Sequence, residues 1–279
     1  MKKPVIFLFG GIGNQLFQIA HALHCHNFMA SDFIICDDFT KSFSTFRTPI
    51  FELFPALNIK LDRLNFKSIK LMTFFGIHPR LQIKILSLLH RRKIVNDRNL
   101  HDFNMLDNFP CPSFHYGYFQ YDRGHFLDSI KYLGLECQQH NDRYVLRDEN
   151  ECAVHIRRGD FLSSKSHTPI PLSYYIDSVR LYNDSGVSRY FLYGVGCEDI
   201  LDELIDNFPT AKFTIMKGLP EDELLQITYF QNHIGSNSTF SLWTLFIALS
   251  YSMRINTPLK ITVPKEVASF FSFAHVRAL

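Results

Sequence analysis

The 279-residue sequence predicts an α/β protein with two parallel sheets. Apolar runs of strand length alternate with helical patterns near the N-terminus, and a second series of this kind begins at "CAVHIR", residues 152–157. The second series directly follows the polar stretch "HNDRYVLRDENE". Strands that alternate with helices form parallel sheets with both faces covered. We therefore expect two Rossmann-like domains, residues 1–148 and 149–279, facing each other across a cleft.

Composition narrows the class of protein. Hydrophobic residues make up 46% of the chain and charged residues 20%, which is typical of globular proteins. A net charge of +2 does not favour nucleic acid as a partner, and the apolar stretches are shorter than the ~20 residues of a membrane-spanning helix. The six cysteines have neither C-x-x-C nor zinc spacing, so we expect reduced thiols in a cytoplasmic protein.

The first series is a strand at residues 5–9, a glycine turn, a helix at residues 14–30 and a strand at residues 32–38. Gly11 and Gly13 begin a G-x-G-x-x-G pattern, which is typical of dinucleotide sites. Asp37 and Asp38 end the next strand, where a ribose-binding acid would stand. Leu16 replaces the third glycine, and this disfavours NAD. An equal alternative is that these glycines only allow the backbone conformation that the turn requires.

The second series carries more elements. We expect strands at residues 152–157, 189–194, 211–216, 233–236 and 259–264, with helices at residues 172–185, 198–208, 221–230 and 241–252. The middle of the chain, residues 39–126, is predicted to be irregular with helical patches.

The stretch "AVHIRRGDF", residues 153–161, predicts an anion site. Alternation along a strand points Val154 and Ile156 into apolar packing, and His155 and Arg157 to the other face. Ligands bind at the carboxyl ends of strands in open α/β sheets, and arginine forks suit phosphate. For the next arginine, Arg158, a surface ion pair with Asp160 is an equal alternative.

A second candidate anion site lies at the start of the helix that follows "HIGS", residues 233–236. Asn237, Ser238, Thr239 and Phe240 stand at this helix start. Hydroxyls and free backbone N–H groups at a helix N-terminus bind anions. The alternative is that Ser238 or Thr239 only caps the helix.

Residues 60–93 form a basic segment in which nine lysines and arginines accompany a single acid, Asp62. Part of it, "RLQIKILSLLHRRK", has apolar residues near helical spacing and a basic end. One interpretation is a solvated helix packed on its own domain. The other is a surface that contacts anionic lipid.

Four stretches together resemble a known family. They are "FGGIGNQLFQIAHAL", "GYFQYDRGHF", "HIRRGDF" and "HIGSNSTFSLW". In the same order and at similar separations, they are similar to landmarks of the bacterial α-1,2-fucosyltransferases, glycosyltransferase family 11. The resemblance implies a GT-B-like fold in which the second domain binds GDP-fucose and the first presents the acceptor. It also implies an inverting, metal-independent transfer to the 2-hydroxyl of a galactosyl group in a surface glycan such as an O-antigen. The enzyme would then act in the cytoplasm, at the inner face of the membrane.

The resemblance also implies roles for the second-domain motif residues. Arg157 would hold the β-phosphate, His155 would lie beside the nucleoside, and Asp160 would order the turn. The residues Ser238, Thr239 and Phe240 would close over the diphosphate. Glu223 stands where related enzymes place a carboxylate for guanine, although an exposed acid at a helix start is an alternative.

In the first domain, the resemblance places the glycine turn at the cleft. Gly11 and Gly13 would keep the backbone close to the sugar, and Asn14 would lie near the reacting centre. No acid stands in the glycine-turn motif "FGGIGNQLFQIAHAL", so a general base is not evident there, and Asp37 or Asp38 is the fallback.

One departure leaves the donor open. The family has Ser-Asp-Asp where this chain has "YGVGCED", residues 193–199. Another nucleotide-sugar donor is therefore an alternative within the class. An NAD-dependent oxidoreductase and a sugar-binding protein without transfer activity are alternatives from other classes.

Overall fold

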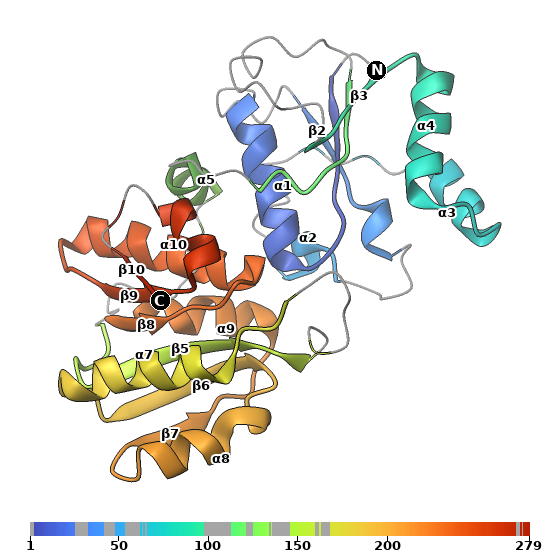
Figure 1. Ribbon diagram of the computed structural model, residues 1–279. Coiled ribbons are helices and arrows are strands. Elements are labelled where there is room, and N and C mark those ends of the chain that lie inside the picture. Colours follow the sequence, from blue (N-terminus) through green and yellow to red (C-terminus); the bar gives the residue numbers. More distant parts are fainter. Residues whose placement is uncertain are drawn as a thin grey trace. The chain divides into compact units, whose positions relative to one another are not determined.

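The computed structural model describes residues 3–25, 33–41, 48–53, 62, 64, 66–97, 113–120, 125–133, 135, 146–159, 162, 168–271, 274 and 276–279. The chain divides into two compact units, unit 1 (Met1–Tyr121) and unit 2 (Asp122–Leu279) (Figure 1). The sequence placed this boundary between residues 148 and 149. The difference arises because α5 (His125–Leu133) packs on α10 (Thr239–Ile255), where the rings of Phe126 and Phe246 stack with centroids 4.7 Å apart.

Unit 1 contains a four-stranded parallel sheet in the order β2-β1-β4-β3. Its elements in chain order are β1 (Val5–Phe7), α1 (Ile12–Cys25), β2 (Ile34–Cys36), the 3₁₀ helix η2 (Asp38–Lys41), α2 (Ile50–Leu53), α3 (Lys67–Phe74), α4 (Pro79–His90), β3 (Lys93–Val95) and β4 (Ser113–His115). The sequence did not predict β3 and β4, which lie in the middle of the chain that was expected to be irregular.

Unit 2 contains a six-stranded sheet in the order β10-β9-β8-β5-β6-β7, and its strand pairs are all parallel. Besides α5 and α10, its elements are β5 (Glu151–Arg157), α7 (Leu172–Asp184), β6 (Arg189–Val195), α8 (Glu198–Asn207), β7 (Lys212–Ile215), α9 (Pro220–Gln226), η6 (Ile227–Tyr229), β8 (Asn232–Ile234), β9 (Lys260–Val263), η7 (Lys265–Phe271) and β10 (Arg277–Ala278). Counted from β5, this is the 3-2-1-4-5-6 order of dinucleotide-binding folds. The predicted α/β class with two Rossmann-like units is confirmed, while the cleft stays a prediction.

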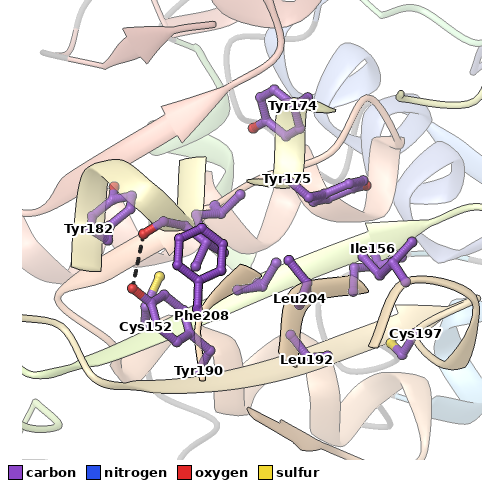
Figure 2. Packing of buried hydrophobic residues seen from close by; sticks show 14 of the residues in the cluster. Cys152, Ile156, Tyr174, Tyr175, Tyr182, Tyr190, Leu192, Cys197, Leu204 and Phe208 are labelled. Atoms are coloured by element: carbon purple, nitrogen blue, oxygen red, sulfur yellow. Dashed lines mark hydrogen bonds between the residues drawn. The ribbon is translucent and has the colours of Figure 1, made fainter. Parts of the chain in front are cut away.

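The two faces of β5 pack against different helices, as the alternation predicted. Val154 and Ile156 join a core cluster with residues of α7 and α8, which Figure 2 shows from close by. Ala153 faces the other way and packs with Tyr193, Phe230 and neighbouring apolar side chains of a second cluster. The central strand is therefore buried on both faces, and only its carboxyl end is free to contribute to a site.

Tyrosine hydroxyls attach α7 to the backbone of β8, of the residue that follows it and of β9. Tyr174 donates to the carbonyl oxygen of Gly235 at 2.8 Å, and Tyr182 donates to those of His233 at 3.0 Å and Lys260 at 2.9 Å. Both tyrosines are buried, so these bonds satisfy hydroxyls that would otherwise be costly to bury. They fix the backbone at the carboxyl end of β8 against the helix.

Glycines let the carboxyl ends of β5 and β6 approach closely. Gly194 has φ +99°, and a Cβ atom there would overlap the carbonyl oxygen of Ile156. A Cβ atom on Gly159 would likewise overlap the side chain of Val195. Residues 157–159 and 193–196 thus meet edge to edge. Within the described residues, no helix is both long and apolar enough to cross a membrane.

A glycine pair tests this close approach. Gly186 has φ +98°, but a Cβ atom added there would meet nothing within 4 Å, so Gly186→Ala measures backbone strain alone. Gly194→Ala adds the overlap with Ile156. We expect Gly194→Ala to lower the free energy of unfolding by about 2 kcal/mol more than Gly186→Ala does, by the usual size of overpacking. Urea unfolding of both variants measures this, and equal losses would contradict it.

Candidate functional site

The order of strands in unit 2 places its candidate site. The chain runs from β5 outward to β6 and β7, then returns to the other side of β5 for β8, β9 and β10. The reversal between β5 and β8 is a topological switch point, where open α/β sheets bind ligands. The two predicted anion motifs follow these two strands. The fold therefore brings residues 155–159 and "SNSTF" together at one edge of the sheet.

His155 joins the two motifs. Its Nδ1 atom lies 2.9 Å from the hydroxyl oxygen of Ser236, and its ring lies 5.4 Å from that of Phe240 between centroids. The side chain is 4% exposed. Burial, and secondly the charge of Arg157, lower the pKa of His155 to about 3. The imidazole is therefore neutral near pH 7 and serves as a hydrogen-bonding group beside the helix start.

A serine network shapes the start of α10. Ser238 is the N-cap, and its hydroxyl accepts from the backbone N–H of Ser241 at 3.1 Å. The hydroxyl of Ser241 in turn accepts from the N–H of Ser236 at 2.8 Å. The capping interpretation of Ser238 is therefore confirmed, and its role toward a diphosphate stays a prediction. Thr239 and Phe240 are half-buried in the first turn, where helical N–H groups lack intrahelical partners.

The two arginines of "HIRRGD" point to different surroundings. Arg157 ends β5, is half-buried, and lies close enough to His155 to lower its pKa. Arg158 donates from Nη1 to the carbonyl oxygen of Ile170 at 2.8 Å, so it holds the segment before α7. A phosphate-binding role for Arg158 stays a prediction. Its proposed partner Asp160 lies outside the described residues.

The side chain of Asn237 links neighbouring segments at this edge of the sheet through hydrogen bonds. Its Nδ2 atom donates to the carbonyl oxygen of Thr168 at 3.0 Å and to Glu266 at 3.3 Å. These bonds join the end of β8 to the segment before α7 and to η7. Asn237 is thus placed at the predicted site, with its amide N–H groups directed to the protein.

Glu223 lies on α9, half-buried, near the carboxyl end of β6. Burial raises its pKa to about 7. Its charge contributes, after burial, to the raised pKa of Tyr193 and of Cys197, so its carboxyl group is near both. Tyr193 pairs with His155 across β5 and β6, and its buried hydroxyl has no partner among the described residues. The sequence analysis missed Tyr193, whose signal was its position in "YGVG".

Unit 1 also brings two sequence motifs together. β1 has β2 on one side and β4 on the other, so the glycine turn after β1 and "GYFQ" after β4 lie at the same edge of the sheet. Gln120 donates to Asn14 Oδ1 at 3.1 Å, joining the two motifs. The glycine with a left-handed conformation is Gly10, at φ +80°, which the sequence analysis did not single out. Gly11 faces open space, and Gly13 is buried in α1.

Two buried glutamines hold this turn in place. Gln15 donates to the carbonyl oxygens of Gly10 at 3.0 Å and Thr48 at 3.1 Å. Gln18 accepts from the N–H of Phe9 at 3.0 Å and donates to the carbonyl oxygen of Gly117 at 3.1 Å. Much of "GGIGNQLFQ" is therefore explained by the fold, and Asn14 is the motif amide left half-exposed.

Comparison with known proteins gives partial likenesses. No protein-family model matches the chain. The chain is similar to an alpha-1,2-colitosyltransferase of Escherichia coli, with 29% identity over 119 residues, which cover 40% of this chain and 40% of that protein. Among solved structures it is similar to POFUT1 in complex with GDP, with TM-score 0.49 and 12% identity over 93% of this chain and 98% of that one. It is also similar to the E. coli heptosyltransferase WaaC with ADP, with TM-score 0.44 and 9% identity over 99% of this chain and 93% of that one.

The buried imidazole predicts an acid sensitivity. Between pH 6.5 and about 3, unfolded His155 binds a proton that the folded state does not bind. Stability contributed by the neutral group is therefore lost as pH falls below about 6.5. His155→Gln should reduce the pH dependence of the free energy of unfolding in this window. The reduction should be at most the slope that the uptake of one proton on unfolding produces.

Urea unfolding at several pH values measures that slope. The exposed His90→Gln is the matched control and should change it less. A slope unchanged in His155→Gln would show that this imidazole is protonated in the folded protein.

Proposed function

We propose that this chain is a glycosyltransferase that moves L-fucose from GDP-fucose to the 2-hydroxyl of a galactosyl acceptor in a surface glycan. Transfer would invert the anomeric centre and require no metal. Unit 2 would bind the donor, and unit 1 would present the acceptor across a GT-B-like cleft. The bacterial α-1,2-fucosyltransferases, family 11, are the family we propose for it.

The switch point between β5 and β8 is the observation that carries this proposal. It gathers a half-buried arginine, a neutral histidine and the N-terminus of the 17-residue helix α10. An arginine fork and helical N–H groups both favour phosphate. Glu223, one strand further along, suits guanine, because one carboxylate accepts from both N1–H and the 2-amino group. The named relative also transfers a sugar in an α-1,2 linkage.

The chemistry follows from charge. Fucosyl transfer passes through an oxocarbenium-like state as GDP departs, so negative charge grows on the β-phosphate. Arg157 and the first turn of α10 would stabilise that charge, and one well-placed donor is worth about 10²–10³ in rate. These groups would replace a metal, so activity should persist in EDTA. Asn14, oriented by Gln120, would position the acceptor hydroxyl.

A colitosyl donor is the second candidate, favoured by the name of the relative. Colitose is L-fucose without its 3-hydroxyl group. A site that hydrogen-bonds a hydroxyl rejects the analogue lacking it by roughly 10⁴–10⁵, whereas a site without that partner accepts both. Turnover with GDP-fucose and with GDP-colitose, followed by mass spectrometry of the product, therefore distinguishes the two donors.

The NAD alternative loses support in unit 1. Asp38, which would bind ribose, is already engaged with the backbone N–H of Phe66 and with the thiol of Cys36. Asp37 is 6% exposed. The burial of Asp37 and the existing hydrogen bonds of the half-buried Asp38 disfavour both as the general base. We propose that NAD is not a ligand, and calorimetry with GDP, UDP and NAD tests this.

Two substitutions separate the roles of the two units. Arg157→Ala removes a charge-assisted bond to the diphosphate, so GDP affinity should fall roughly tenfold to a hundredfold, and turnover should fall further. Asn14→Ala should leave GDP affinity nearly unchanged and reduce transfer about a hundredfold or more. Calorimetry and a fucosyl-transfer assay measure the two quantities.

Matched controls are Arg180→Ala, an exposed arginine paired with Asp177, and Asn207→Ala on α8. Both should resemble the unmodified protein. The reverse pattern, with GDP affinity lost at Asn14 and kept at Arg157, would assign the phosphates to the first glycine turn.

Glu223 predicts a pH-dependent affinity. Its pKa is raised to about 7, and only the ionised carboxylate accepts both guanine donors. GDP affinity should therefore rise as pH increases from 6 to 8. Glu223→Gln should weaken GDP binding roughly tenfold or more and remove most of this rise.

The terminal phosphate of GDP also changes its protonation in this pH range. This effect on affinity is the same in every variant, so the difference between variants reports on Glu223. The exposed neighbour Asp222→Asn is the control. Inosine diphosphate, which lacks the 2-amino group, should bind the unmodified protein more weakly than GDP. Equal affinity for both nucleotides, together with an unchanged GDP affinity in Glu223→Gln, would exclude Glu223 from base recognition.

A further inference from the structure

The helices α3 and α4 carry an unusual solvent-facing surface. Of the large apolar side chains exposed in the described residues, six gather on these helices and the residues beside them. We name this the α3–α4 surface: Leu71, Phe74, Phe75, Leu81, Leu88 and Leu89, with exposed fractions from 52% to 83%. Exposed bases alternate with them: Lys67, Lys70, Arg80, Lys84, Arg91 and Lys93.

The inward faces of both helices are already used. Ile69, Ile83 and Leu86 are buried in the core cluster of unit 1. The buried Gln82 on α4 donates to the hydroxyl of Thr73 on α3 at 3.1 Å and to the carbonyl oxygen of Ile77 at 2.7 Å. The helices thus form one fixed piece at the edge of unit 1, where Figure 1 shows them side by side.

The outward faces do not have the polar composition that solvent favours. On α3, Lys67, Lys70, Leu71 and Phe74 follow helical spacing and share the exposed side. The outward face of a helix packed on a core is ordinarily charged or polar. Here exposed leucines and phenylalanines stand among lysines, the composition of helices that lie in a membrane interface.

The charge is of one sign. Residues 66–93 contain no aspartate or glutamate. We propose that the α3–α4 surface docks on an anionic lipid bilayer, with its bases at the headgroups and its apolar side chains inserted among the acyl chains. A second copy of the chain would bring like charges together, and four of the six apolar side chains are leucines, which do not stack on nucleic-acid bases. The proposal does not depend on the transferase function.

Arg92 belongs to the fold and not to this surface. It is 5% exposed, and its Nη1 atom donates to the carbonyl oxygens of Lys3 at 2.7 Å and Ser113 at 3.2 Å. Lys60 and Arg63 lie outside the described residues. The basic segment seen in the sequence therefore divides into structural and exposed bases, and the exposed ones on the two helices are those to test.

Vesicle sedimentation with the full chain tests the proposal. The chain should bind phosphatidylcholine vesicles that contain phosphatidylglycerol, bind vesicles of phosphatidylcholine alone weakly, and be largely released by high salt. A triple variant, Lys67→Glu, Lys70→Glu and Lys84→Glu, should weaken binding about a hundredfold or more, since each base contributes roughly fivefold. A double variant, Phe74→Ser and Leu88→Ser, should weaken it about tenfold or more at unchanged charge.

Matched changes on unit 2 are the controls. Lys131→Glu, Lys212→Glu and Lys260→Glu alter the same charge at exposed positions, and Ile205→Ser with Met253→Ser removes comparable exposed apolar groups. Circular dichroism and urea unfolding verify folding. Absent binding at low salt, or equal weakening by the controls, overturns the proposal. Polyglutamate binding as tight as vesicle binding, with the Phe74 and Leu88 double variant unaffected, also overturns it and indicates an acidic protein partner.

Discussion

The reversal of strand order in each sheet is the constraint on which the site depends. Crossovers between parallel strands are right-handed, so the connections leaving β5 and β8 pass to opposite faces. α7 packs on the face of Val154 and Ile156, and the start of α10 lies on the face of His155. The carboxyl ends of the two strands are consequently left uncovered between the helices. In unit 1 the segments that follow the neighbouring strands β1 and β4 are joined by the hydrogen bond from Gln120 to Asn14.

Most polar residues of the motifs belong to the fold. Buried polar atoms need partners, and Gln15, Gln18, Ser241 and Arg158 each supply one to backbone that the close packing would otherwise leave unpaired. Their presence in a motif therefore says little about substrate. Arg157 and Thr239 are half-buried beside the switch point of unit 2, and Asn14 is half-buried in the glycine turn of unit 1. These are the motif residues to which the proposed function assigns chemistry.

The sequence predicted the elements of unit 2 well, because long apolar and helical patterns such as those of β6 and α7 are set locally. It missed β3, β4 and β10, whose pairing depends on neighbouring strands. It assigned Gly11 and Gly13 to the turn, whereas the left-handed residue is Gly10, since backbone conformation at a G-G pair is fixed by the packing around it. The raised pKa of Glu223 and the proximity of Tyr193 arise from tertiary burial. No local pattern could have predicted either property.

The glycines at the end of β6 bear on donor choice. Gly194 is required by the approach of Ile156, and a Cβ atom on Gly196 would lie 2.9 Å from that of Arg158. Packing therefore excludes side chains at Gly194 and Gly196, two positions of the stretch in which the resembling family carries Ser-Asp-Asp. On the proposed function, recognition of the nucleoside would shift to the neighbouring Tyr193 and Glu223. Because such a shift changes contacts to the nucleoside and not to the sugar, the altered stretch by itself favours neither fucose nor colitose.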